Sequence, residues 1–140
     1  MVLSKKEISI LIEIVFSVLF AIVYLPFFYE NQVTSYVFGD LIQQVIEIIL
    51  FAAIYFTITY GLLEVSYKTK TTDDERDDMI HSKSYKLGYI LYEISLFVCI
   101  GILINSPNTP NGAIVFSILA LVLSVSFVKS TYQFYLYRTF

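Results

Sequence analysis

Four long runs of apolar residues constrain the fold of this chain more than any other feature of its sequence. They cover residues 8–28, 41–63, 87–104 and 113–128. A helix needs about 20 mostly apolar residues to cross about 30 Å of hydrocarbon, and these runs reach or approach that length. Transmembrane β-strands would instead alternate polar and apolar residues over about ten positions, which these runs do not do. The sequence therefore predicts an all-α integral membrane protein, a bundle of four spanning helices.

Composition supports this class and excludes others. Of the 140 residues, 57% are hydrophobic and 15% are charged, whereas about a quarter are charged in soluble domains. The net charge of −3 provides no basic surface for nucleic acid. The run 8–28 is longer than the apolar part of a signal peptide, and no cleavage site of small residues follows it, so we expect a retained span. It should end near Pro26 and the polar residues after it, and residues 1–140 should form one domain.

Basic residues are distributed on one side of these predicted spans. The segments 29–39 and 105–112 contain no lysine or arginine. All nine basic residues lie elsewhere: Lys5, Lys6, Lys68, Lys70, Arg76, Lys83, Lys86, Lys129 and Arg138. Because lysine and arginine are enriched in cytoplasmic loops, we predict that both termini and the middle loop lie in the cytoplasm.

The middle loop contains a densely charged segment that precedes the third apolar run. Thr72 followed by Glu75 matches a capping box, which marks the start of a helix. No proline interrupts residues 73–104, so we expect one long helix whose first turns, about 73–86, extend into the cytoplasm. Lys83 and Lys86 would then lie at the membrane surface, where they can contact anionic lipid headgroups.

Two functions are conceivable for this acidic helix start. Asp74, Glu75, Arg76 and Asp77 could dock a cytoplasmic protein partner, as in a regulatory or immunity-type membrane protein. Asp74, Asp77 and His81 fall on one helix face, and imidazole with carboxylates suits a transition metal. A solvated, capped helix face explains the same residues, and metal-binding motifs are absent from the sequence. We therefore predict no metal site, with this trio as the alternative.

The same segment resembles part of a group of known sequences. Asp74, Glu75, Arg76 and Asp77, then Ile80, Lys83 and Ser84, are similar to a loop motif of small uncharacterised bacterial and archaeal membrane proteins. In those proteins an Asp-Glu-Arg motif is followed by an apolar residue and a Lys-Ser or Lys-Ala pair that leads into a span. The resemblance implies a bacterial or archaeal cytoplasmic membrane and implies no activity.

Several acids lie inside the predicted spans. Glu13, Glu47 and Glu93 are within apolar runs, and Glu64 follows the second run directly. An ionisable residue at the centre of a span costs about 2.5–3.5 kcal/mol and usually faces protein or water. From the cytoplasm outward, the expected order is Glu64, then Glu13 and Glu93, then Glu47. Polar residues one helical turn away accompany two of them: Gln43 and Tyr89.

These acids permit two interpretations. They can be protonated or hydrogen-bonded and stabilise the bundle, because burial favours a neutral carboxyl. Alternatively they form a path for protons or cations in an oligomeric channel or carrier, since no basic residue lies deep in any span to neutralise them. Small multidrug exporters are similar in helix count and in a first-span glutamate, which Glu13 would match. This chain departs from them in its lack of tryptophan, its few glycines and its long charged loop.

Enzymatic chemistry is not indicated. His81 is the only histidine, Cys99 is the only cysteine, and no serine lies in a nucleophile elbow. We therefore predict no catalytic residues and no cofactor. A third hypothesis is a structural subunit of a larger membrane complex. Under each hypothesis we expect contact with the lipid bilayer and self-association, with a dimer as the favoured oligomer.

Overall fold

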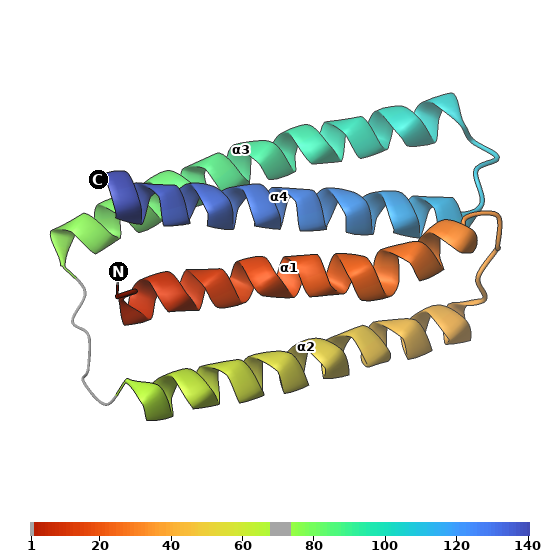
Figure 1. Cartoon of the computed structure of the whole chain (residues 1–140). Coiled ribbons are helices and arrows are strands. Elements are labelled where there is room, and N and C mark those ends of the chain that lie inside the picture. Colours follow the sequence, from red (N-terminus) through yellow and green to blue (C-terminus); the bar gives the residue numbers. More distant parts are fainter. Residues whose placement is uncertain (1, 68–73) are drawn as a thin grey trace.

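The computed structural model describes residues 2–67 and 74–140. Within these residues the chain forms four helices and no strand: α1 (Lys5–Glu30), α2 (Phe38–Ser66), α3 (Glu75–Asn105) and α4 (Asn111–Thr139) (Figure 1). Each helix is long and apolar enough to cross a membrane. The predicted all-α class and the four-helix bundle are confirmed.

Capping boxes start two of the helices. The side chain of Ser4 accepts a hydrogen bond from the backbone N–H of Glu7, and the Glu7 carboxylate accepts one from the backbone N–H of Ser4. Asp74 and Asp77 form the same reciprocal pair at the start of α3. The predicted cap Thr72 lies outside the described residues. Residue 73, near which the helix was expected to begin, also lies outside the described residues, and within them α3 begins at Glu75 after the cap Asp74.

The ends of α1 and α4 lie beyond their apolar runs. The helix α1 continues through Pro26 and ends at Glu30, among the polar residues where its end was expected. A proline removes one backbone hydrogen bond, which a long helix can lose without ending. The fourth helix extends beyond its apolar run, through Lys129 to Thr139, so the aromatic residues after Lys129 are helical.

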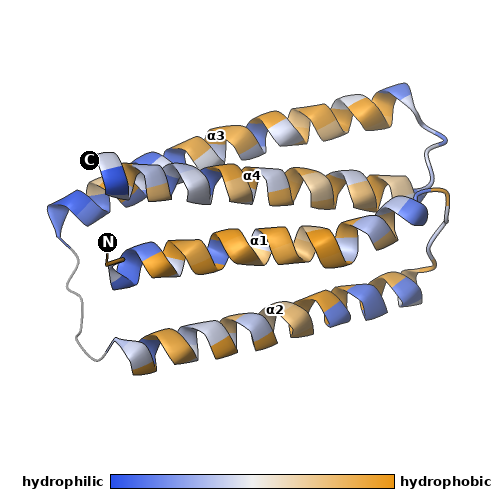
Figure 2. Ribbon diagram, viewed as in Figure 1, coloured by the Kyte–Doolittle hydropathy of each residue, from blue (hydrophilic) through white to orange (hydrophobic). Residues whose placement is uncertain are grey.

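The helices lie side by side in the order α2, α1, α4, α3 (Figure 1). The most extensive interface joins α1 to α4, followed by that between α3 and α4, while α1 and α2 share a much smaller one. Among the described residues, the backbone of α2 therefore lies close to α1 and that of α3 close to α4, while the ion pair between Lys6 and Asp77 also connects α3 to α1. Both termini lie at one end of the bundle, hereafter the termini end, where polar residues gather (Figure 2).

Aromatic rings fill the small interface between α1 and α2. The ring of Phe16 lies 4.7 Å from that of Phe56 and 6.0 Å from that of Phe51, measured between centroids. Tyr24 and Phe51 meet edge to face at 5.4 Å. The hydroxyl of Tyr55 donates a hydrogen bond of 2.8 Å to the backbone oxygen of Ile12. We call these rings the aromatic barrier; they occupy the middle of the α1–α2 interface.

At the opposite end, hereafter the loop end, the start of α4 is attached to the α1–α2 loop. The Asn111 side chain bonds both backbone groups of Tyr36, accepting from its N–H at 2.6 Å and donating to its oxygen at 2.8 Å. The next residue, Gly112, donates its backbone N–H to the oxygen of Thr34 at 3.1 Å. These bonds fix the first helical hairpin to α4.

Candidate functional site

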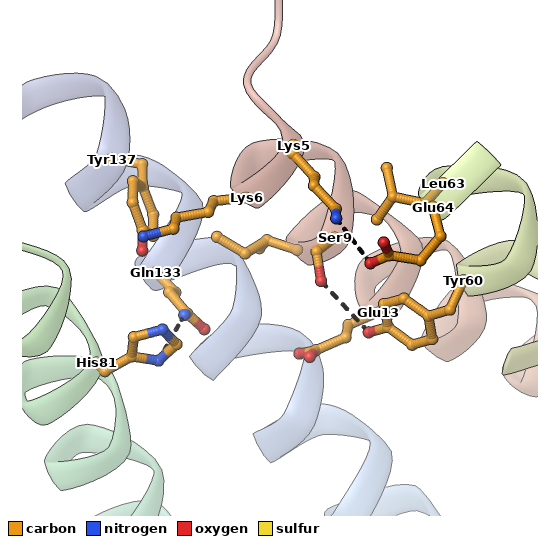
Figure 3. Close-up of a pocket in the computed structure, with 11 residues that line it drawn as sticks. Lys5, Lys6, Ser9, Glu13, Tyr60, Leu63, Glu64, His81, Gln133 and Tyr137 are labelled. Carbon is orange, nitrogen blue, oxygen red and sulfur yellow. Dashed lines mark hydrogen bonds and ion pairs between the residues drawn. The ribbon is translucent and has the colours of Figure 1, made fainter. Parts of the chain in front are cut away.

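A polar cavity of about 300 Å³ opens at the termini end, and all four helices contribute to it (Figure 3). Helix α1 supplies one wall because its polar residues recur at helical spacing in its first turns. The lining residues are Lys5, Lys6, Ser9, Ile10 and Glu13 from α1, Tyr60, Leu63 and Glu64 from α2, His81 from α3, and Gln133 and Tyr137 from α4.

On the α2 side, an ion pair and a hydroxyl contact close the cavity. The ammonium of Lys5 lies 2.7 Å from the carboxylate of Glu64, which is itself exposed. Deeper in the cavity, Ser9 Oγ donates to the hydroxyl of Tyr60 at 3.5 Å (Figure 3). These contacts connect α2 to α1 where the helices otherwise meet little.

On the α3–α4 side, polar side chains are buried. Gln133, which is 5% exposed, places its amide nitrogen 3.2 Å from His81 Nδ1. Lys6 forms an ion pair with Asp77, which is 7% exposed. Because buried charges are costly unless paired, this ion pair fixes the start of α3 against α1.

The carboxylate of Glu13 lies at the inner end of this cavity and also lines a second crevice. That crevice measures about 440 Å³ and shares Glu13 and Tyr60 with the cavity. The carboxylate accepts a hydrogen bond of 3.1 Å from Ser130 Oγ and lies 3.8 Å from the ammonium of Lys129. The expectation that no basic side chain lies near the span acids is therefore wrong for Glu13, because α4 continues as a helix and Lys129 reaches α1.

Glu47 lines a separate cavity towards the loop end, of about 240 Å³ between α1 and α2. Gln43 donates to the Glu47 carboxylate at 3.4 Å. Gln44 lines the same cavity, and its buried Oε1 accepts no hydrogen bond from any part of the chain that the structure describes.

Tyr89 and Glu93 do not join the other predicted pathway residues. Both are exposed on α3, at the edge of the row of helices, and Tyr89 hydrogen-bonds Glu93 one turn away. The structure therefore brings Glu13 and Glu64 to one cavity, places Glu47 in another along the same α1–α2 interface, and leaves Glu93 on an outer surface.

The acidic helix start is largely engaged within the molecule. Asp74 caps α3, and Arg76 donates a hydrogen bond of 2.8 Å to the backbone oxygen of Tyr137. Asp77 faces Lys6, whereas His81 faces Gln133. Among residues 2–67 and 74–140, no three His, Cys, Asp or Glu side chains lie close enough to hold a metal, and this includes the alternative trio of Asp74, Asp77 and His81.

Asp77 makes the stability of this end pH-dependent. Burial alone would raise its pKa, but hydrogen bonds from Lys6, the Asp74 backbone and Tyr137 lower the pKa from 3.8 to about 2. A lowered pKa contributes stability above about pH 4, which is lost as the pH falls towards 2, and the shift corresponds to about 2 kcal/mol. We expect the melting temperature of the wild type to fall more than that of Asp77→Asn between pH 5 and pH 2. If the melting temperatures of the wild type and Asp77→Asn fall equally between pH 5 and pH 2, this prediction is wrong.

Several residues of the site carried no signal in the sequence. Lys129 and Ser130 follow the fourth apolar run, where they resemble an ordinary cytoplasmic flank, and Gln133 lies among aromatic residues. Gln133 lies three or four residues after Ser130 and Lys129, which is the spacing of one helix face. A predicted fourth helix that continued to Thr139 would therefore have shown a polar stripe. Gln44 lies beside the predicted Gln43, but its orientation into the α1–α2 cavity depends on helix rotation, which the sequence does not encode locally.

Comparison with known proteins provides no relative for this site. No family model matches the chain, and neither a curated protein nor a solved structure shows significant similarity to it.

Proposed function

We propose that this protein carries protons or other small cations across a bacterial or archaeal cytoplasmic membrane, along the α1–α2 interface. The observation that supports this most is the position of Glu13, which lines both the cavity at the termini end and the crevice that continues from it between α1, α2 and α4. The proposed orientation, with both termini in the cytoplasm, follows from the distribution of lysine and arginine.

The surroundings of Glu13 suit reversible binding. Its side chain is 36% exposed, so water or an ion can reach it. Lys129, at 3.8 Å, is too distant for a tight hydrogen-bonded pair. An arriving cation would compete with Lys129 for the carboxylate, and Lys129 can move towards the ring of Tyr85, whose centroid lies 4.9 Å from its ammonium. A cation could therefore bind to and leave Glu13 with only a small movement of the Lys129 side chain.

The rest of the proposed path follows the same interface. The aromatic barrier separates Glu13 from the Glu47 cavity, where the unpartnered oxygen of Gln44 and a carboxylate provide ligands for a cation. Because α2 contacts α1 over a small area, rocking of α2 would open the barrier at modest cost. Glu93 has no role in this path, and oligomerisation is not required for it.

Transport by purified protein in liposomes tests the proposal. Glu13→Gln should lower proton or cation flux at least about tenfold, because losing the carboxylate charge weakens cation binding by more than about 1.4 kcal/mol. The matched control is Glu75→Gln, which changes an exposed acid in the first turn of α3 and should leave flux unchanged.

Two outcomes would overturn this function. Wild-type flux at the level of empty liposomes, tested with protons, Na⁺ and K⁺, would remove the transport function altogether. Equal flux in the wild type and Glu13→Gln would remove Glu13 from the path.

A further inference from the structure

The outer face of α3 combines an apolar surface with one ionisable residue. Tyr89, Glu93, Leu96, Ile100 and Leu103 follow one another at alternating steps of four and three residues, which is the spacing of a helix-pairing seam. All five are exposed, with Tyr89 at 65% and Leu96 at 64%. We call these five residues the α3 seam.

The α3 seam cannot turn into the bundle. The opposite face of α3 carries the buried residues Ile80, Ser84 and Gly88, and α4 is its main neighbour among the described helices. Rotating α3 to bury Glu93 would expose these residues and break the ion pair between Asp77 and Lys6.

Lipid is a poor cover for Glu93. The carboxyl lies about 9 Å inside the apolar run that begins at residue 87, at about 1.5 Å of rise per residue. Tyr89 satisfies one of its hydrogen bonds from the same helix, which leaves further acceptor capacity facing outward. The other edge of the row also carries an exposed acid, Glu47, but that residue lines the α1–α2 cavity and accepts a hydrogen bond from Gln43.

We propose that the α3 seam is the interface between two copies of this chain. Copies that insert in the same orientation are related by an axis along the membrane normal, so their α3 helices pair in parallel. In a parallel pair each seam residue lies near its own copy, so the two Tyr89–Glu93 pairs meet near the axis, while Leu96, Ile100 and Leu103 pack against their own copies further along the helices. This proposal is independent of transport through the α1–α2 interface.

Disulfide crosslinking in native membranes tests the interface, starting from Cys99→Ser, which removes the single cysteine. On this background Leu96→Cys and Ile100→Cys should crosslink into dimers on oxidation. Ile94→Cys, on another face of α3, and Ile54→Cys, on α2, are controls of similar exposure. Equal crosslinking at all four positions, crosslinking at Ile54 alone, or monomers throughout would overturn the proposal.

A second measurement tests the role of Glu93. In liposomes, energy transfer between labelled copies should report an association constant about three- to tenfold lower for Glu93→Ala than for the wild type, the range for one interhelical hydrogen bond in a membrane. Ile94→Ala should leave the constant unchanged. If Glu93→Ala associates as tightly as the wild type, Glu93 does not stabilise the dimer.

Discussion

Gly112→Ala is expected to destabilise the protein by about 3 kcal/mol, at the upper end of the cost of overpacking. A Cβ at residue 112 would lie 2.5 Å from the backbone oxygen of Thr34 and closer still to that of Asn31. Both atoms belong to backbone, so no side-chain rotation relieves the clash. The α1–α2 loop must move, which breaks the hydrogen bonds from Gly112 to Thr34 and between Asn111 and Tyr36.

Gly101→Ala provides the matched control for this change. No atom lies within 4 Å of a Cβ built on Gly101, and alanine favours a helix by about 0.5–1 kcal/mol over glycine. We expect this variant to equal or exceed the wild type in stability. The measurement is the fraction of detergent-solubilised protein that remains monodisperse after heating, followed by size-exclusion chromatography. Equal losses for the two glycine variants would show that the loop contact does not contribute to stability.

Asp77→Ala is expected to have a similarly large effect, about 3–5 kcal/mol, because it removes the carboxylate from a buried ion pair. The change removes the ion pair with Lys6 and also one half of the capping box of α3, since the Asp77 carboxylate accepts a bond of 3.1 Å from the Asp74 backbone. The α3 start should detach from α1, which amide hydrogen exchange over residues 75–84 would detect as faster exchange.

Two further variants identify the cause of that effect. Asp78→Ala removes a neighbouring exposed acid and should change stability by less than about 0.5 kcal/mol. The double variant Lys6→Met with Asp77→Asn should be more stable than the sum of the single changes predicts, because the two side chains interact directly. If the effects of Lys6→Met and Asp77→Asn on stability are additive, the two side chains do not interact directly.

The fold could be predicted because its main determinant is local. Each apolar run contains enough residues to identify a helix without knowledge of its neighbours, and polar segments separate the runs. Helix ends were harder to predict, because they depend on a few hydrogen bonds. Asp74 and Thr72 are both good caps by residue type, and each is followed three residues later by an acid, so the sequence alone does not decide between the two capping boxes.

The candidate site was predictable only in part, because its geometry depends on the order and rotation of the helices. Glu13 could be identified as an acid in an apolar run, but its contact with Lys129 and Ser130 requires α1 and α4 to be neighbours. Glu93 has the same sequence signature as Glu13, yet it faces outward because Ser84 and Gly88 favour the opposite face of α3 for packing against α4.

The spatial order of the helices has a consequence for biosynthesis. The first helix packs mainly against the fourth, and the third has the fourth as its neighbour, so α4 joins both halves of the molecule. A ribosome releases α4 last, and until then α1 and α3 lack their principal partners. The loop bound by Asn111 and Gly112 likewise waits for the end of translation. Chains truncated before residue 111 would therefore lose the two largest interfaces and keep the small α1–α2 interface and the ion pair between Lys6 and Asp77, and they should be recognised as incomplete and degraded.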